Sequence, residues 1–211
     1  MLRTALAAAI ALGMSGPVFS QQIDVYSTDK QLQYFNKKRL EGKVAEEFSE
    51  FKKADYYAAF AYNPGTDVFG YHVGVHSLAY AQKAAMEICR HFSDKDPNSC
   101  KLYAQIVPKG YTHKSGSQTL SQSASEAYRG EFQSYFNNES TKHLVFAIAA
   151  EGAWSWKTRE ADTSFSETKR KTLEACRVFS AEDRQDDVTW WTETLGTHVN
   201  YNCKIVFSKT H

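Results

Sequence analysis

The chain has 211 residues, with 25 basic and 24 acidic side chains, four cysteines and an aromatic fraction of 14%. Residues 1 to 20 contain one Arg and no acid, so the remainder carries 24 charges of each sign. A neutral chain is a poor partner for nucleic acid or for an anionic membrane surface, because both require an excess of Lys and Arg. The length suffices for one large hydrophobic core or two small ones.

Residues 1 to 20 have the pattern of an export signal. Arg3 supplies the positive start, residues 5 to 14 form an apolar stretch, and Val18 and Ser20 suit a signal peptidase. We therefore expect cleavage after Ser20 and a periplasmic or secreted location, with no membrane span after removal of the signal. The apolar stretch is shorter than the ~20 residues of a spanning helix, and an uncleaved anchor is the alternative.

Residues 21 to 107 predict a first module in which a helix is followed by two strands, a second helix and a third strand. Apolar residues at spacings of three to four predict the helices, and the turn chemistry of Pro64 and Gly65 separates the first two strands. The expected elements are a helix over 29–52, strands over 56–63 and 68–76, a helix over 78–92 and a strand over 100–107.

Residues 108 to 121 are rich in Gly and Ser and predict a linker. Residues 122 to 211 then predict a second module with the same order of elements. The expected elements are a helix over 124–135, strands over 143–150 and 153–159, a helix from Ser164 or Ser166 to Phe179, and a strand over 199–207. An additional strand is expected around Trp190 and Trp191.

One short pattern occurs in both modules. Residues 86 to 93 read M-E-I-C-R-H-F-S, and residues 173 to 180 read L-E-A-C-R-V-F-S. Each follows an apolar run and precedes a Cys-Lys pair, at residues 100 and 203. The sequence therefore predicts an α+β protein that arose by tandem duplication of a helix-β-β-α-β module with antiparallel sheets.

Four cysteines in an exported chain imply disulfide bonds. The repeat favours the pairs Cys89 with Cys100 and Cys176 with Cys203, each closed within its own copy. A bond that ties the two copies together is the alternative that the sequence leaves open. Each bond within a copy would clamp a helix to a strand and stabilise the fold by about 2–4 kcal/mol.

The run from Tyr57 to Val107 resembles a bacterial secreted domain of unknown function. The matching residues in the first copy are Ala59, Phe60, Ala61, Tyr62, Gly70, Tyr71, Ser77, Ala81, Ala85, Cys89 and Cys100. The matching residues in the second copy are Phe146, Ala147, Trp154, Trp156, Cys176 and Cys203, with Glu167, Lys169 and Lys171 in place of the alanines. The resemblance implies export and a small α+β module, and it implies no known activity and no catalytic residues.

Histidine, cysteine and aspartate clusters do not predict a metal site or a cofactor. His72 and His76 would lie about 13 Å apart on a strand, too far to share one zinc ion, so we expect them on an exposed strand face. Cys89 is assigned to a disulfide and not to a catalytic pair with His91. The acidic residues Asp183, Asp186 and Asp187 lack the spacing of a calcium loop.

Glu87 and Glu174 recur at the same place in the repeat, and each is followed by an arginine, Arg90 or Arg177. Paired carboxylates can perform acid–base chemistry on a glycosidic bond. The simpler interpretation is a helix-surface carboxylate stabilised by the arginine three residues later. An envelope hydrolase that uses Glu87 or Glu174 is therefore an alternative, and no catalytic residue is predicted.

The tryptophans are the candidate binding residues. Trp154 and Trp156 would share one face of a strand, whereas Trp190 and Trp191 are adjacent and would face opposite ways. Exposed aromatic side chains form binding platforms, and packing in the core is the alternative for each. The leading hypothesis is a non-enzymatic envelope or secreted protein that binds a protein, peptide or glycan. Besides the hydrolase, an inhibitor or protective factor against another exported protein is a further alternative.

Overall fold

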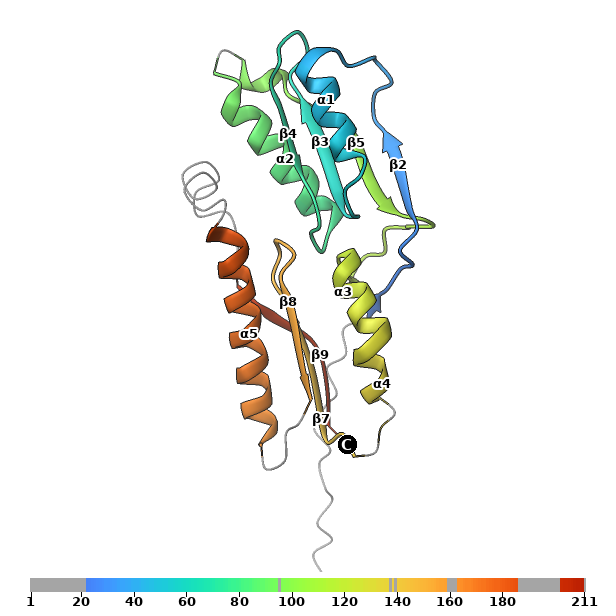
Figure 1. Ribbon diagram of the computed structural model, residues 1–211, viewed down its shortest axis with the longest axis vertical. Coiled ribbons are helices and arrows are strands. Elements are labelled where there is room, and N and C mark those ends of the chain that lie inside the picture. Colours follow the sequence, from blue (N-terminus) through green and yellow to red (C-terminus); the bar gives the residue numbers. More distant parts are fainter. Residues whose placement is uncertain are drawn as a thin grey trace, which may run out of the picture.

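The computed structural model describes residues 22–94, 96–136, 138, 140–158, 163–185 and 202–210. Within them the chain is an α+β protein whose two modules lie one above the other along the long axis (Figure 1). No helix in these ranges is both long enough and apolar enough to cross a membrane. The expected export signal and the expected strand around Trp190 and Trp191 lie outside the described residues.

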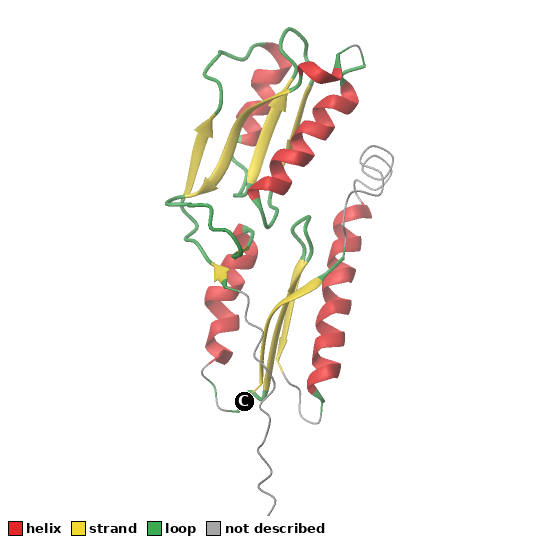
Figure 2. Cartoon of the chain, turned by 180° about the vertical axis from the view of Figure 1, so that it is seen from behind, coloured by secondary structure: helices red, strands yellow, loops and turns green. Residues whose placement is uncertain are grey.

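The first module contains a four-stranded antiparallel sheet in the order β2-β5-β3-β4. Its strands are β2 (Lys30–Tyr34), β3 (Ala58–Tyr62), β4 (Phe69–His72) and β5 (Lys101–Pro108). Helices α1 (Gly42–Phe51) and α2 (Leu78–Phe92) cover its opposite faces (Figure 2), and a short 3₁₀ turn, η1 (Pro97–Ser99), precedes β5. Phe48 of α1 packs edge-on against Phe60 of β3, with ring centroids 5.2 Å apart.

Small residues bring α2 close to its face of this sheet. A Cβ atom on Gly70 of β4 would lie 2.5 Å from the backbone nitrogen of Cys89 and 2.6 Å from the backbone oxygen of Ala85. Ala81 and Ala85 of α2 are both fully buried. The small side chains spaced four residues apart therefore form the surface by which α2 approaches the sheet.

The helix expected over residues 29–52 is wrong in its first half. Residues Lys30–Tyr34 form the edge strand β2, which pairs along its whole length with β5, and the helix begins only at Gly42. The spacing of Leu32, Phe35 and Leu40 imitates a helical period. Pairing with β5 satisfies the backbone groups of this segment instead, and Phe35 remains about half exposed.

The second module contains a three-stranded antiparallel sheet in the order β8-β7-β9. Its strands are β7 (His143–Ile148), β8 (Trp154–Thr158) and β9 (Lys204–Thr210). Helix α5 (Phe165–Gln185) packs on this sheet. On the other side lie α3 (Gln122–Ala127), a π-helical turn η2 (Tyr128–Phe132) and α4 (Gln133–Phe136) (Figure 1). Phe132 is fully buried and packs edge-on against Phe146 of β7 at 5.2 Å.

The expected linker contains one short strand. Strand β6 (Gln118–Thr119) pairs with β1 (Ile23–Asp24), near the start of the described chain, and this pair is parallel. The two large sheets are antiparallel, as the sequence predicts. The β1–β6 pair is the one parallel pair among the described strands.

Both predicted disulfides are confirmed, and the alternative of a bond between the copies is excluded. Cys89 pairs with Cys100 and Cys176 with Cys203, with Cα atoms 6.0 and 6.1 Å apart. The four sulfur-bearing residues are all buried. Each bond joins a helix to the residue that precedes the last strand of its module. The clamp is therefore mechanical, and two disulfides suggest an oxidising, extracytoplasmic location.

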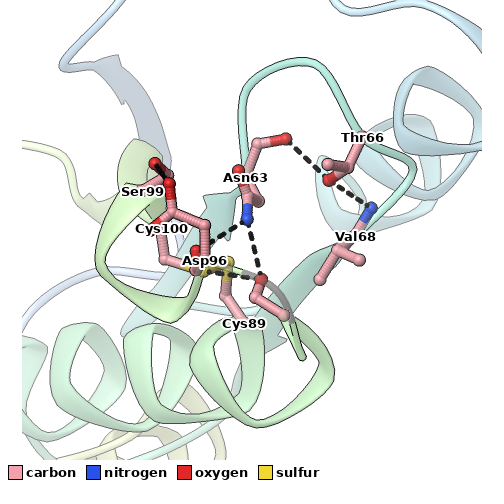
Figure 3. Close-up of a disulfide and its surroundings, with 8 residues drawn as sticks. Asn63, Thr66, Val68, Cys89, Asp96, Ser99 and Cys100 are labelled. Atoms are coloured by element: carbon pink, nitrogen blue, oxygen red, sulfur yellow. Dashed lines mark hydrogen bonds between the residues drawn. A yellow bond between two sulfur atoms is a disulfide. The ribbon is translucent and has the colours of Figure 1, made fainter.

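A buried polar network surrounds the first disulfide (Figure 3). The side-chain amide of Asn63 donates to the Ser93 hydroxyl and to the Asp96 carbonyl, both at 3.0 Å. The Ser93 hydroxyl in turn lies 3.3 Å from the sulfur of Cys100. Since buried polar groups require partners, this network fixes the turn between α2 and β5 around the disulfide.

Candidate functional site

The loop that follows β4 faces the second module. This loop, residues 73–77, contains the buried Val75 and His76. Gly74 turns the chain with a φ of 71°. Ser77 ends the loop as the N-cap of α2, where its hydroxyl accepts from the backbone N–H of Tyr80 at 3.1 Å. The turn and the cap together hold the His76 side chain between the modules.

The imidazole of His76 hydrogen-bonds at both nitrogens to residues far away in the sequence. Its Nδ1 accepts from the backbone N–H of Ser121 at 2.9 Å, and its Nε2 donates to the carbonyl of Ala153 at 3.0 Å. The ring is therefore neutral, with its proton on Nε2. Burial lowers the pKa of His76 to about 4, and the nearby Lys204 also lowers it. The Thr119 hydroxyl donates to the carbonyl of His76.

Backbone contact reinforces this junction. The turn between β7 and β8 places Gly152, with a φ of 123°, against the loop of the first module. A Cβ atom on Gly152 would lie only 2.5 Å from the carbonyl oxygen of Gly74. Gly152 therefore permits an approach that a side chain would prevent, whereas Gly74 supplies the positive φ of the facing loop.

A cavity of about 650 Å³ opens beside the junction, and we call it the inter-module cleft. Both modules line it. The first contributes Val73, whereas Ser123 at the start of α3, Glu151, Trp154 and Phe179 lie beyond the linker. Val73 is 36% exposed and Phe179 is 49% exposed. The cleft therefore presents apolar side chains to solvent next to a hydroxyl and a carboxylate.

The two tryptophans of β8 share one face of the strand, as expected, but have different surroundings. Trp154 lines the cleft, where its indole N–H donates to the Ser123 hydroxyl at 3.2 Å and its ring stacks on Phe146 at 5.8 Å. Trp156 is half-buried and packs against the side chains of Phe132, at 6.0 Å, and Tyr135, at 5.5 Å. A binding role for either stays a prediction, and the candidates Trp190 and Trp191 lie outside the described residues.

The expectation that His72 and His76 share an exposed strand face is wrong. His72 is half-buried in β4 with its ring 5.7 Å from that of Tyr80, whereas His76 lies beyond the end of the strand and is buried at the junction. No group of three metal-ligating side chains comes together in the described part of the chain. Sequence reasoning missed the role of His76, because its ring partners lie 45 and 77 residues away.

The carboxylates Glu87 and Glu174 lie on helices of different modules, so they do not form a pair. Glu87 lies 3.7 Å from Lys83, and Glu174 lies 2.9 Å from Arg170. In both cases the ion-pair partner is the cation four residues earlier. The interpretation that the arginine three residues later stabilises the carboxylate is therefore wrong. Asp183, Asp186 and Asp187 have no described side chain.

Glu151, the carboxylate at the cleft, was not singled out by sequence reasoning. It lies in the turn between β7 and β8, and its Oε1 accepts from the hydroxyl of Ser180 on α5. This contact joins the turn to the helix beside the cleft. No motif in the sequence marks it, because the two residues are 29 positions apart.

Comparison with protein-family models, with curated proteins and with solved structures finds no match. The resemblance to a bacterial secreted domain therefore stays a prediction.

Proposed function

We propose that the chain is an exported, non-enzymatic binding protein whose inter-module cleft binds a peptide segment of another exported protein. The observation that carries this proposal is the placement of Trp154 beside the exposed side chains of Val73 and Phe179. The cavity volume of about 650 Å³ lies within the usual range for ligand sites. Exposed apolar side chains around a concave surface are typical of an interaction site.

The chemistry of the lining favours a peptide with an apolar side chain. A glycan presents many hydroxyl groups, each of which loses free energy when it is buried without a partner. The indole N–H of Trp154 already donates to Ser123, so it is not available to pair with a sugar hydroxyl. An acidic ligand would place its charge beside Glu151. The preferred ligand group is therefore apolar and either neutral or basic.

The separation of Glu87 from Glu174 supports binding over hydrolysis. Acid–base hydrolysis needs two carboxyl groups on either side of one bond, and these two lie on α2 and α5, each beside a cation. The burial of both disulfides likewise supports a mechanical role for the cysteines.

The test is selection of peptides from a random displayed library on the full chain, followed by calorimetry with one selected peptide. Phe179→Ala and Val73→Ser alter exposed side chains of the cleft, and we expect each to weaken binding roughly tenfold or more. Val178→Ala is the matched control, because Val178 is 50% exposed on the same helix but does not line the cleft. Equal affinity for all three variants would place the site elsewhere. Binding of soluble cell-wall glycans but of no peptide would show that the ligand is a glycan and would contradict the proposed peptide ligand.

A further inference from the structure

We propose that His76 is an acid-sensitive joint that holds the two modules together and couples the inter-module cleft to pH. The coupling to ligand binding rests on the function proposed for the cleft. The joint itself rests on the hydrogen bonds of the imidazole, and the two parts can be tested separately.

The geometry allows only one protonation state of the ring. The backbone N–H of Ser121 points at Nδ1 from 2.9 Å, so this nitrogen has to offer a lone pair. A proton on Nδ1 would set two donors against each other, and the contact would have to break. His76 is only 2% exposed. A charged ring that stayed in place would therefore be a buried charge, and its Nδ1 could no longer accept the hydrogen bond from Ser121.

Both hydrogen bonds of the ring end beside residues that line the cleft. Ser121 is the N-cap of α3, and Ser123, two residues later, accepts from the indole of Trp154. Ala153 lines the cleft and directly precedes Trp154. Loss of either hydrogen bond would detach the segment at Ser121 or at Ala153 from the ring of His76, and these segments form the wall of the cleft. Protonation of His76 therefore loosens the surface on which the ligand would lie.

The charged groups around His76 oppose its protonation or are held by other partners. Lys204 of β9 disfavours a second positive charge. Glu151 lies in the same turn as Ala153 and accepts from Ser180. The first turns of α2 and α3, which begin beside the ring and beside its partner Ser121, contain no acidic residue. No described carboxylate from these elements therefore forms a hydrogen bond with the imidazole.

The direction of the pH effect follows from the two states. In the closed joint the pKa of His76 is about 4, and in an opened joint it returns to the ordinary 6.5. Above pH 6.5 the joint has its full stability, and as the pH falls from 6.5 to 4 the opened state gains protons that the closed state does not. The equilibrium constant for opening should rise roughly 70-fold between pH 7.5 and pH 4.5.

The first experiment measures amide hydrogen exchange in the full chain at pH 7.5 and pH 4.5, corrected for the intrinsic exchange rate. We expect opening of residues 119–123 and 149–154 to increase roughly 50- to 100-fold at the lower pH. His76→Gln keeps polar groups without titrating in this range, so its two profiles should agree. His113→Gln, at an exposed linker residue, is the control and should behave like the unaltered chain.

Wild-type profiles that do not differ between the two pH values would overturn the joint, as would an equal response in His76→Gln. If His76→Gln does not fold, His76→Asn and direct titration of the imidazole by NMR give the same decision. A titration midpoint near 6.5 in the folded chain would contradict the proposal.

The second experiment compares the affinity of one selected peptide at the two pH values. We expect weaker binding at pH 4.5 in the unaltered chain and no such loss in His76→Gln. Equal binding at both pH values, in a chain whose joint opens, would overturn the coupling. If no peptide binds at either pH, the proposed function fails, while the exchange experiment still decides the joint.

Discussion

The two modules have the same strand register. In the first, Ala61 of β3 pairs with Leu102, and the ladder shifts between Phe60 and Ala61. In the second, Ala147 of β7 pairs with Ile205, and the ladder shifts between Phe146 and Ala147. Irregularities of this kind are specific features of a sheet. Their recurrence at corresponding residues supports the tandem duplication that the sequence predicts.

The helices that carry the disulfides correspond residue by residue. Each begins after a serine whose hydroxyl accepts from the backbone N–H three residues later, Ser77 in α2 and Ser164 in α5. Twelve residues later each helix has its cysteine. The intervening Ala81 and Ala85 correspond to Thr168 and Thr172, both buried. The interpretation that Glu167, Lys169 and Lys171 replace the alanines is therefore wrong.

The modules differ in how the helix is held to the sheet. The residue that corresponds to Gly70 is Ser155, because the two pair with Ala61 and Ala147. In the first module the helix backbone occupies the space where a side chain would be. In the second, the hydroxyl of Ser155 donates to the carbonyl of Thr172 at 2.6 Å. Close contact in one copy is therefore replaced by a hydrogen bond in the other.

Removal of a disulfide should cause the largest loss of stability in either module, with a small difference between the two. The bond from Cys176 to Cys203 closes a loop with a sequence separation of 27, whereas that from Cys89 to Cys100 closes one of 11. The loop-entropy model predicts losses of about 3.5 and about 3 kcal/mol when each pair is replaced by alanine. Urea unfolding followed by circular dichroism measures both. A larger loss for the shorter loop would show that the network around Asn63 contributes more than chain entropy.

Substitution of Gly70 by the residue of the second module should cost nearly as much. Gly70→Ser would put a side chain into the backbone of α2, and we expect a loss of about 3 kcal/mol. All four tryptophans lie in the second module. Circular dichroism during urea unfolding should therefore report the loss of stability of the first module, whereas tryptophan fluorescence should report the unfolding of the second module, which is less affected. A stability change below about 1 kcal/mol would show that α2 can move away from the sheet at little cost.

Removal of the hydroxyl that holds the helix in the second module should be milder. Ser155→Ala removes one hydrogen bond and leaves the Cβ atom that separates helix from strand, so we expect a loss of about 1 kcal/mol. Tryptophan fluorescence during urea unfolding measures it. Ser134→Ala is the comparison, because this exposed hydroxyl also donates to a backbone carbonyl, that of Glu131, at 2.6 Å, and water can replace the bond. An equal loss of stability in the two variants would contradict a particular contribution from the buried Ser155 hydroxyl.

Local patterns predicted what local chemistry determines. Helix α2 lies where its apolar spacing and Ser77 place it, and the repeat identified both disulfide pairs. The prediction of a helix failed at Lys30–Tyr34, because pairing with the distant strand β5 overrides the helical spacing of the apolar residues there. Of the residues that line the inter-module cleft, only Trp154 was a candidate binding residue in the sequence. The buried role of His76 depends on Ser121 and Ala153, which only the folded chain brings to it.

The helix caps should give the smallest effects and the closest agreement between the modules. Ser77→Ala and Ser164→Ala each remove a hydroxyl that accepts from the first turn, at 3.1 and 3.2 Å, so we expect losses of about 1 kcal/mol each. Ser164→Thr, which keeps a capping hydroxyl, is the control and should lose little stability. A clearly greater loss for Ser77 would reveal a contribution from the neighbouring His76, whose counterpart in the second module is Thr163. Measured at pH 7.5 and pH 4.5, the excess should shrink at the lower pH if it arises from the joint.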